Sequence, residues 1–361
     1  MNIADNYVAI MAGGIGSRFW PESRVNLPKQ FLDLLGTGKS LIQWTYKRFE
    51  KIVPKENIFF ITNEQYIPKL KEQIPGLGNE NILSEPSRKN TAPCAAYFAH
   101  KIRTQNPNAN IIMSPADHII LDEQSFEATA LDALEFVSKN KALLTMGIKP
   151  TRPDTGYGYI QYDTNNELDK AFKVKTFTEK PSIDLARTFL KSGDFLWNAG
   201  IFVWNVNTIM EALANYLPEI NDVFLQAKDA YNTPDETKAI NKLYPHCTNI
   251  SIDYGVMEKA KNVFVIPSNF GWSDLGTWES AYENSTKDYL GNAVLGNNVM
   301  VIDTNECMVK APDEKLVLLQ GLEKYIVIDT KDVLLICERN KEQMIKEYVA
   351  EVKRNKGEKF L

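Results

Sequence analysis

The sequence of 361 residues contains no apolar run of the roughly 18 residues that a membrane-spanning helix requires. Its first residues lack the basic and then apolar segments of a secretory signal. The four cysteines form no C-x-x-C pair and there are only three histidines, which disfavours a structural zinc site. A net charge of −5 gives no general attraction to nucleic acid or to an acidic membrane. We therefore expect a cytoplasmic protein with reduced thiols and with no nucleic-acid or membrane partner.

The composition itself is that of a globular protein, with 44% hydrophobic and 24% charged residues. At roughly 150 residues per domain, the length predicts about two domains. Short apolar runs alternate with amphipathic segments in the first part of the chain, and we predict buried strands at 7–11, 58–62, 111–114 and 143–148. This alternation predicts an α/β fold in which crossovers join parallel strands in a Rossmann-like domain.

The middle of the chain is less regular. Its apolar patterns predict longer strands and then helices, at 157–162, 173–178, 200–204, 206–230 and 234–243. These elements complete the first domain, which we place at 1–285.

The end of the chain carries a short repeat. The sequence Val-Ile-Asp-Thr occurs at 301–304 and again at 327–330, each time followed by a polar pair and another apolar run. Short strands separated by turn residues predict a small β-rich module with a C-terminal helix over 286–361. Two copies are too few for a free-standing solenoid, so we expect the module to dock on the main domain or on a second subunit.

A glycine-rich turn follows the first predicted strand directly. Glycines let backbone N–H groups approach an anion, and we assign nucleotide binding to Ala12, Gly13, Gly14, Gly16 and Ser17, with the turn amides from 13 to 17 holding phosphate oxygens. Two cations further along, Arg18 and Lys29, can neutralise a polyphosphate.

Two familiar nucleotide motifs do not fit this chain. The dinucleotide pattern G-x-G-x-x-G would need a glycine at the position of Phe19. The P-loop pattern that Gly38 suggests would need a glycine at the position of Asp33. The glycine-rich turn must therefore belong to another kind of phosphate site.

The strand followed by G-G-x-G-x-R-x-x-P and Pro28-Lys29 resembles the signature of the sugar-phosphate nucleotidyltransferases. Further matching segments are EPSRKNTAP at 85–93, SPADH at 114–118, GYGYI at 156–160, FTEKP at 177–181, WNAGIF at 197–202 and GWSDLG at 271–276. The first of these is typical of the guanylyl branch. The resemblance covers 7–285 and implies a Rossmann-like, GT-A-like domain with a β-helix-like module. It also implies transfer from GTP to mannose 1-phosphate, giving GDP-mannose and diphosphate by direct attack on the α-phosphorus.

Two aspartates are the candidate ligands of a Mg²⁺ ion. Asp117 follows a predicted strand at its carboxyl end, where open α/β sheets bind ligands, and Asp274 lies in a glycine-flanked turn. Mg²⁺ prefers one or two carboxylates together with substrate oxygens. The resemblance implies that both aspartates hold the same ion, while Arg18 and Lys29 act on the departing phosphates. His118 is expected to be structural, because the sugar phosphate is already an anion.

The resemblance also implies a sugar-phosphate site. Glu179, Lys180 and Asn198 match the family's residues, since a carboxylate and an amide can bind sugar hydroxyls and a lysine can bind the phosphate. Gly156 would permit close approach of the backbone, and Asp274 is assigned to the same substrate.

Guanine must be distinguished from adenine by its O6 atom and its 2-amino group. Residues 84–90 can supply a donor and an acceptor, with Asn90 as the first candidate and Arg88 as a second partner for O6 or a phosphate. Asn90 has an alternative role as the cap of the following helix.

Several alternatives stay open. Another hexose or heptose 1-phosphate would use the same residue types. A regulatory protein that has lost catalysis is disfavoured, because Arg18, Lys29, Asp117 and Asp274 are all present. A fused isomerase activity is not expected, because 286–361 contains no histidine. A homodimer is expected only from family analogy.

Overall fold

The computed structural model describes residues 2–14 and 16–361, so residue 15 of the predicted phosphate-binding turn lies outside the described residues. The chain divides into two compact units. The large unit consists of Met1–Gly13, Thr45–Ala116 and Ile120–Trp272, and the small unit consists of Gly14–Trp44, Asp117–Ile119 and Ser273–Leu361. The boundary predicted at 285 stays a prediction.

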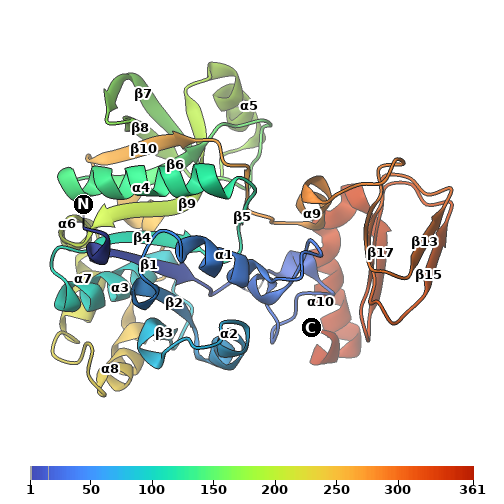
Figure 1. Cartoon of the computed structure of the whole chain (residues 1–361), viewed down its shortest axis with the longest axis horizontal. Helices are drawn as coiled ribbons and strands as arrows, with labels where there is room; N and C mark the ends of the chain where they lie inside the picture. Colours follow the sequence, from blue (N-terminus) through green and yellow to red (C-terminus); the bar gives the residue numbers. More distant parts are fainter. Residues whose placement is uncertain (1, 15) are drawn as a thin grey trace. The chain divides into compact units, whose positions relative to one another are not determined.

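The large unit is built on a nine-stranded sheet in the part of the chain that the structure describes, with the order β3-β2-β1-β4-β9-β6-β10-β8-β7 (Figure 1). The strands are β1 (Asn6–Met11), β2 (Ile58–Asn63), β3 (Ile82–Glu85), β4 (Asn110–Pro115), β6 (Leu143–Ile148), β7 (Tyr159–Leu168), β8 (Ala171–Thr178), β9 (Phe195–Asn205) and β10 (Val263–Ser268). The α/β class is confirmed, and all four strands predicted in the first part of the chain are present.

The sheet is mixed, although the alternation of strands and helices predicted parallel strands. β1 pairs in parallel with β2 and β4, but β9 lies antiparallel between β4 and β6. Apolar patterning shows which face of a strand is buried and not the direction in which the strand runs, so the sequence could not show this insertion.

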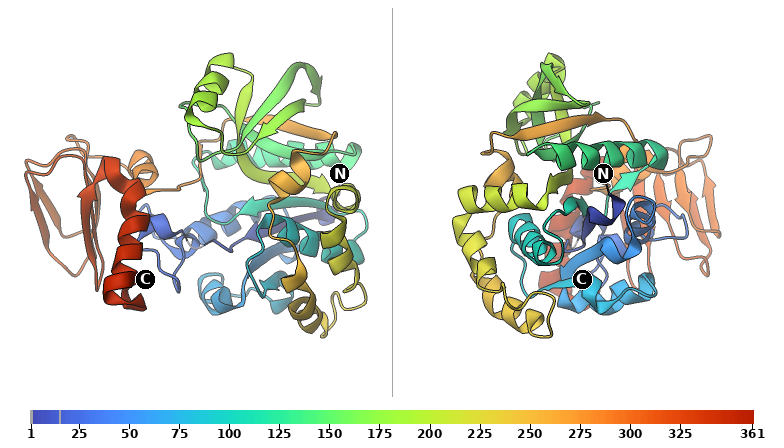
Figure 2. Two further views of the ribbon diagram at one scale, coloured as in Figure 1. Left: turned by 180° about the vertical axis from the view of Figure 1, so that it is seen from behind. Right: turned by 60° about the vertical axis from the view of Figure 1, so that its left-hand side comes forward.

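Helices cover both faces of this sheet (Figure 2). α4 (Glu123–Lys139) contacts β4, β6, β9 and β10. On the other face, the main core joins alternate strand residues to α3 (Thr91–Gln105), α6 (Val206–Tyr216) and α7 (Pro218–Leu225). The helix predicted at 206–230 is thus interrupted, because Pro218 cannot continue α6 and instead begins α7. The other helices are α1 (Leu41–Phe49), α2 (Ile67–Gln73), α5 (Ile183–Ser192) and α8 (Glu236–Leu243).

The small unit contains the β-rich module. Its elements are α9 (Trp278–Asn284), β12 (Ala293–Leu295), β13 (Val299–Ile302), β14 (Met308–Lys310), β15 (Val317–Gln320), β16 (Tyr325–Asp329), β17 (Leu334–Glu338) and α10 (Ile345–Lys356). β12, β14 and β16 pair in parallel, as do β13 and β15, which is the pairing of a chain that winds in coils. The Val-Ile-Asp-Thr repeat is not a structural repeat, because its copies fall in β13 and β16, which belong to different sheets.

Short elements complete the description. β5 (Ile119–Ile120) and β11 (Trp272–Ser273) lie where the chain passes from one unit to the other. A turn of 3-10 helix at Arg339–Met344 precedes α10. No helix in residues 2–14 and 16–361 has the length and apolar character needed to cross a membrane.

Candidate active site

Within the small unit, Lys29 contacts both residues that are predicted to bind the metal ion. It contacts Asp117 through the carboxylate and Asp274 through the backbone oxygen. Its side chain is only 6% exposed, and its Nζ donates to Asp117 Oδ2 at 3.0 Å and to the backbone oxygen of Asp274 at 2.6 Å. Burial opposes ionisation of Asp117, but Lys29 and His118 outweigh it and lower the pKa of that carboxyl. The Asp117 carboxylate is therefore charged at neutral pH and can bind a cation.

The glycine-rich turn is shaped around Lys29. Gly16 has a φ angle of 66°, in the left-handed region, and its carbonyl oxygen accepts a hydrogen bond from Ser23 Oγ at 2.6 Å. A Cβ atom at position 16 would collide with the Cβ of Lys29. Gly16 is therefore required both by its backbone conformation and by the close approach of Lys29.

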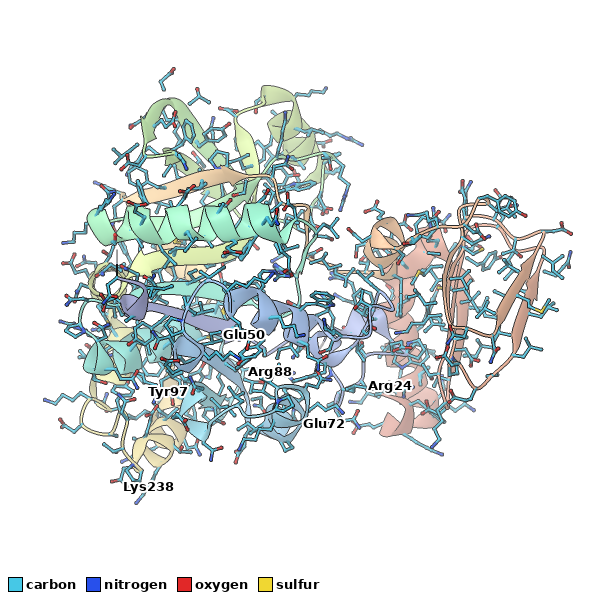
Figure 3. The ribbon with its side chains drawn as sticks, in the orientation of Figure 1. Arg24, Glu50, Glu72, Arg88, Tyr97 and Lys238 are labelled. Carbon is cyan, nitrogen blue, oxygen red and sulfur yellow. The ribbon has the colours of Figure 1, made fainter. Side chains whose placement is uncertain are left out.

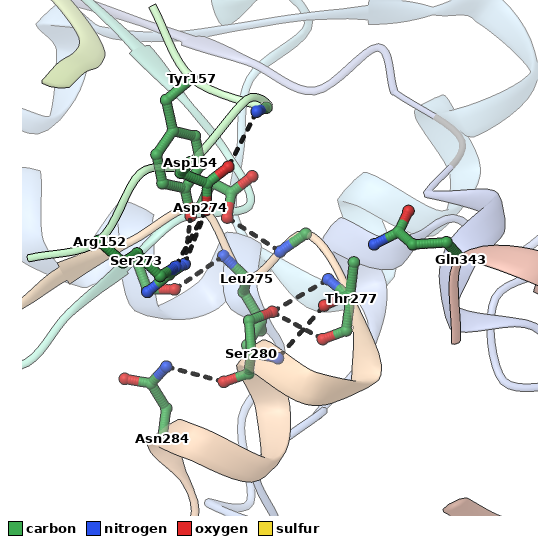
Figure 4. A network of polar contacts seen from close by, with 12 residues as sticks. Arg152, Asp154, Tyr157, Ser273, Asp274, Leu275, Thr277, Ser280, Asn284 and Gln343 are labelled. Atoms are coloured by element: carbon green, nitrogen blue, oxygen red, sulfur yellow. Dashed lines mark hydrogen bonds and ion pairs between the residues drawn. The ribbon is translucent and has the colours of Figure 1, made fainter. Parts of the chain in front are cut away.

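Asp274 lies in a tight turn before α9 (Figure 4). Its Oδ1 accepts from the N–H of Gly276 at 3.1 Å, and the N–H of Leu275 donates to Ser273 Oγ at 3.1 Å. Thr277 then caps α9 in a capping box with Ser280. These local hydrogen bonds hold the Asp274 carbonyl towards Lys29 and orient its carboxylate.

The predicted sugar-phosphate residues Glu179, Lys180 and Asn198 lie together in the large unit. Asn198 Oδ1 accepts from Thr145 Oγ at 3.0 Å, and its Nδ2 donates to Asp253 Oδ1 at 2.9 Å. Lys180 Nζ donates to Glu179 Oε1 at 2.6 Å. An aromatic wall adjoins this group, since the ring of Tyr157 meets those of Trp197 and Trp272 edge to face.

Gly158 is the glycine that allows this cluster to form. A Cβ at position 158 would collide with Glu179 Oε2, and its carbonyl oxygen accepts from the N–H of Asn198 at 2.8 Å. The predicted Gly156 is exposed, and its N–H donates to Asp154 Oδ1 at 2.8 Å. The role assigned to Gly156 stays a prediction.

Asp253 completes the cluster, and the sequence analysis did not identify it. Burial and then the nearby Glu179 raise its pKa from 3.8 to about 6. The folded protein therefore binds a proton at Asp253 more tightly than the unfolded chain does, so this group lowers stability as the pH rises from about 4 to above 6. A buried carboxyl group that lowers the folding stability in this way is typical of a functional site.

Replacing Asp253 by Asn tests this penalty. The new side-chain amide would keep an acceptor for Asn198 but carry no charge. A shift of this size corresponds to about 3 kcal/mol, which solvent screening reduces to about 1–2 kcal/mol for a partly exposed side chain. Denaturant unfolding at pH 8 should show Asp253→Asn more stable than the natural protein by that amount, with the difference lost near pH 4. The exposed Asp229→Asn variant should show no change at either pH, and a destabilised Asp253→Asn variant at pH 8 would refute the account.

Glu85 is the second acidic residue that the sequence analysis did not single out. It ends β3 half-buried, and Tyr244 Oη donates to its Oε1. Its Oε2 faces the glycine-rich turn, since a Cβ at Gly13 would lie 3.4 Å from that oxygen. Burial raises the pKa of Glu85 to about 7, against the effects of Tyr244 and Arg88. One carboxylate oxygen thus remains available beside Gly13.

The residues predicted to read guanine have other contacts. Asn90 has a φ angle of 68°, and its side chain accepts from the N–H of Thr91 at the start of α3. Arg88, labelled in Figure 3, donates from Nη2 to Tyr66 Oη at 3.0 Å. Asn90 therefore has the helix-capping role that was its alternative, and base recognition by either residue stays a prediction.

Comparison with known proteins decides the family. A family model described as nucleotidyl transferase matches residues 7–290. The chain belongs to the nucleotidyl transferase family. A second model, described as MannoseP isomerase/GMP-like beta-helix domain, matches residues 296–352 of this nucleotidyl transferase. The predicted fold, an α/β nucleotidyltransferase domain followed by a small β-rich module, is confirmed.

Three individual proteins are similar to this chain over most of its length. The nucleotidyl transferase is 38% identical over 352 residues to the mannose-1-phosphate guanylyltransferase of Salmonella montevideo, covering 95% of this chain and 73% of that protein. A crystal structure described as mannose-1-phosphate geranyltransferase from Thermus thermophilus is 29% identical, has a TM-score of 0.86 and covers 97% of this chain and 99% of the other. One described as mannose-6-phosphate isomerase from Helicobacter pylori is 27% identical, with a TM-score of 0.60, over 74% of this chain and 99% of the other.

The two residues that were not predicted, Glu85 and Asp253, differ in the strength of their sequence signal. Glu85 stood inside a quoted motif, so only its role was missed. Asp253 gave a weaker signal, as a single acidic side chain between Ile252 and Tyr254 in a mostly apolar segment. Its partner Asn198 is far away in the sequence, so only folding brings the two together.

Proposed function

We propose that this nucleotidyl transferase is a mannose-1-phosphate guanylyltransferase, which converts GTP and α-D-mannose 1-phosphate to GDP-mannose and diphosphate. Curated relatives that carry this name are 34–38% identical over nearly the full chain. The observation that carries the proposal is the buried Lys29 ammonium, which contacts both Asp117 and Asp274. The chain thus has a fixed positive group in contact with the Asp117 carboxylate and with the backbone of the Asp274 turn, and phosphoryl chemistry requires a charge held in place in this way.

The reaction needs charge neutralisation rather than proton transfer. An oxygen of the sugar phosphate forms a bond to the α-phosphorus of GTP while the bond to the bridging oxygen breaks and diphosphate leaves. The sugar phosphate is an anion at neutral pH, so no general base is required. Lys29, Arg18 and the turn amides from 13 to 17 would stabilise the charge on the departing phosphates.

A divalent cation fits the carboxylates of the small unit. Among residues 2–14 and 16–361, no group of three or more His, Cys, Asp or Glu side chains is placed to enclose a metal ion. Mg²⁺ needs no such enclosure, because it uses one or two carboxylates and completes its shell with water and phosphate oxygens. Asp117 and Asp274 would hold it, and when bound it would neutralise phosphate oxygens and orient them.

The sugar-phosphate residues have matching chemistry. The Glu179 carboxylate and the Asn198 amide would bind hydroxyl groups, and Lys180 would bind the 1-phosphate. Asn198 is already oriented by Thr145 and Asp253, so little ordering is needed when the sugar binds. Tyr157 and Trp197 would form an apolar wall for the sugar ring.

Glu85 is the residue that we propose to read guanine. Guanine presents N1–H and its 2-amino group as donors, and the Glu85 Oε2 atom beside Gly13 is an acceptor. Adenine lacks both donors at these positions. The Glu85 carboxyl is charged above its pKa of about 7. In that form a hydrogen bond to it is worth roughly 1.5–3 kcal/mol, which is about a 10- to 100-fold preference, so the preference should increase as the pH rises through 7.

Inosine triphosphate tests this role, because inosine lacks only the 2-amino group. We expect the natural protein to prefer GTP over ITP in kcat/KM by about tenfold or more. Glu85→Ala should bring the ratio close to one, and Glu85→Gln provides a second test if loss of the Tyr244 contact impairs folding. Glu72→Ala, at an exposed position of α2, should leave the ratio unchanged. An undiminished preference in both Glu85 variants would exclude this role.

Product analysis tests the proposed function itself. The purified chain, incubated with GTP, mannose 1-phosphate and Mg²⁺, should give GDP-mannose that is resolved by ion-exchange chromatography, and the reverse reaction should consume GDP-mannose only when diphosphate is added. Parallel reactions with mannose 6-phosphate test for the isomerase activity named in one related structure. Isomerisation without GDP-mannose formation would refute the proposal.

The proposal includes the setting of the reaction. We place it in the cytoplasm, which is consistent with Cys94, Cys247, Cys307 and Cys337 being buried free thiols. The partners proposed are the two substrates, with neither nucleic acid nor membrane, and a homodimer stays a prediction.

A further inference from the structure

The last segment of the chain packs on the phosphate turn within the small unit. Phe19 and Trp20 share a buried cluster with Trp278 of α9 and with Ile345 of α10. The indole Nε1 of Trp20 donates to the backbone oxygen of Phe360 at 2.7 Å. The end of the chain is therefore in contact with the turn that carries Arg18.

Glu342 connects this segment to α9. It lies in the 3-10 turn before α10, and its Oε2 accepts from the N–H of Glu279 at 2.7 Å. That N–H belongs to the first turn of α9, where backbone donors have no partner inside the helix. The side chain of Thr277, the N-cap residue of α9, also donates a hydrogen bond to the Glu342 carboxylate. Glu342 thus completes the capping of the helix that directly follows the Asp274 turn.

A second contact from the same segment fixes α9. Arg339 Nε lies 2.7 Å from Glu279 Oε2, and its guanidinium lies 3.9 Å from the centre of the Tyr282 ring. Both partners belong to α9. The helix is therefore held at its first turn and along one side by residues of the C-terminal module.

The turn that carries Arg18 also packs on α9. The ring of Phe19, the residue after Arg18, meets that of Trp278 edge to face at 5.0 Å. The indole Nε1 of Trp278, in the first turn of α9, donates to the backbone oxygen of Trp20 at 3.3 Å. By capping α9, Glu342 therefore holds the helix that contacts the Arg18 turn and directly follows the Asp274 turn.

We propose that Glu342 is a positioning residue of the C-terminal module, which holds the Asp274 turn and the turn that carries Arg18 by capping α9. The role concerns the nucleotide and its metal ion, not the sugar. It rests on the proposed function for the assignment of Arg18 to the triphosphate and of Asp274 to Mg²⁺. The β-rich module is then a working part of the nucleotide site rather than an appendage.

Two variants test the capping role. Glu342→Ala removes the acceptor, and we expect it to raise the KM for GTP and the Mg²⁺ concentration for half-maximal activity by about fivefold each. Glu342→Gln keeps an oxygen that can accept from the N–H of Glu279, so we expect both quantities to stay within about twofold of the natural values. The KM for mannose 1-phosphate should change less than about twofold in both variants, since no sugar contact is lost. Glu347→Gln, at an exposed position of α10, is the matched control and should match the natural protein.

The same measurements can overturn the proposal. Unchanged KM for GTP and unchanged Mg²⁺ requirement in Glu342→Ala would refute it, as would an equal rise in KM for both substrates. A rise in Glu342→Gln as large as that in Glu342→Ala would also refute it. If Glu342→Ala does not fold, Glu342→Met, which keeps the volume but cannot accept from Glu279, takes its place with the same expected result. A natural protein that forms no GDP-mannose refutes the proposed function instead, and calorimetric titration of the variants with GTP and Mg²⁺ then decides whether Glu342 positions the nucleotide site.

Discussion

Replacing Asp117 by Asn lowers kcat for GDP-mannose formation by about 10³-fold or more, while the protein stays folded. Removing one group that stabilises transition-state charge costs about 10²–10³-fold, and Asp117 is expected both to bind the cation and to hold Lys29. Asparagine has the same shape and still offers an oxygen to Lys29 Nζ, so the local fold is preserved. Single-turnover measurements at saturating GTP and Mg²⁺, with circular dichroism as the folding check, give the answer.

The control for this experiment is Asp303→Asn in the same unit. Asp303 is exposed and has a φ angle of 46°, a conformation that asparagine also accepts. It should retain full activity. An Asp117→Asn enzyme within about tenfold of the natural rate would show that this carboxylate does not bind an essential cation.

Replacing Lys29 by Met should lower kcat by about 10²–10³-fold with little change in the KM for GTP. Methionine fills a similar volume but removes the charge. A positive group that neutralises the charge developing on the departing phosphates stabilises mainly the transition state. The Asp117 carboxylate would lose the ammonium that lowers its pKa. Steady-state kinetics separates kcat from KM, and a variant in which only KM rises would contradict the assignment.

The substitution Gly16→Ala tests the position of the Lys29 side chain without changing that residue. The added Cβ is unfavourable at a φ angle of 66° and collides with the Cβ of Lys29, so it should displace that side chain without changing its chemistry. We expect a loss of kcat similar in direction to that of Lys29→Met. Gly193→Ala is a suitable control, since its φ of 80° carries the same backbone strain but no atom lies within 4 Å of the added Cβ.

The parts of this site that are formed by residues close together in the sequence could be predicted from that sequence. The strand before the glycine-rich turn and the turn holding Asp274 follow from apolar runs and turn residues. The family motifs added that Lys29, Asp117 and Asp274 act together, although they are far apart in the chain. The hydrogen bonds of Lys29 agree with that grouping, but the roles themselves stay predictions.

The remaining features depend on tertiary structure. The direction of β9 cannot be read from its apolar pattern. The contact of Asp253 with Asn198 joins residues that are 55 positions apart in the sequence. The contact of Tyr244 with Glu85 likewise joins distant segments. Glu342 lay in a segment predicted as part of the C-terminal module, and nothing in its local sequence indicated α9 as its partner.

The most direct test of the whole account is diphosphate release from a matrix of four nucleoside triphosphates and four sugar 1-phosphates, namely those of mannose, glucose, galactose and fucose, with and without Mg²⁺. The account predicts metal-dependent release for GTP with mannose 1-phosphate and at most weak release for the other pairs. Release that prefers another nucleotide or another sugar, or that proceeds equally without a divalent cation, would contradict it.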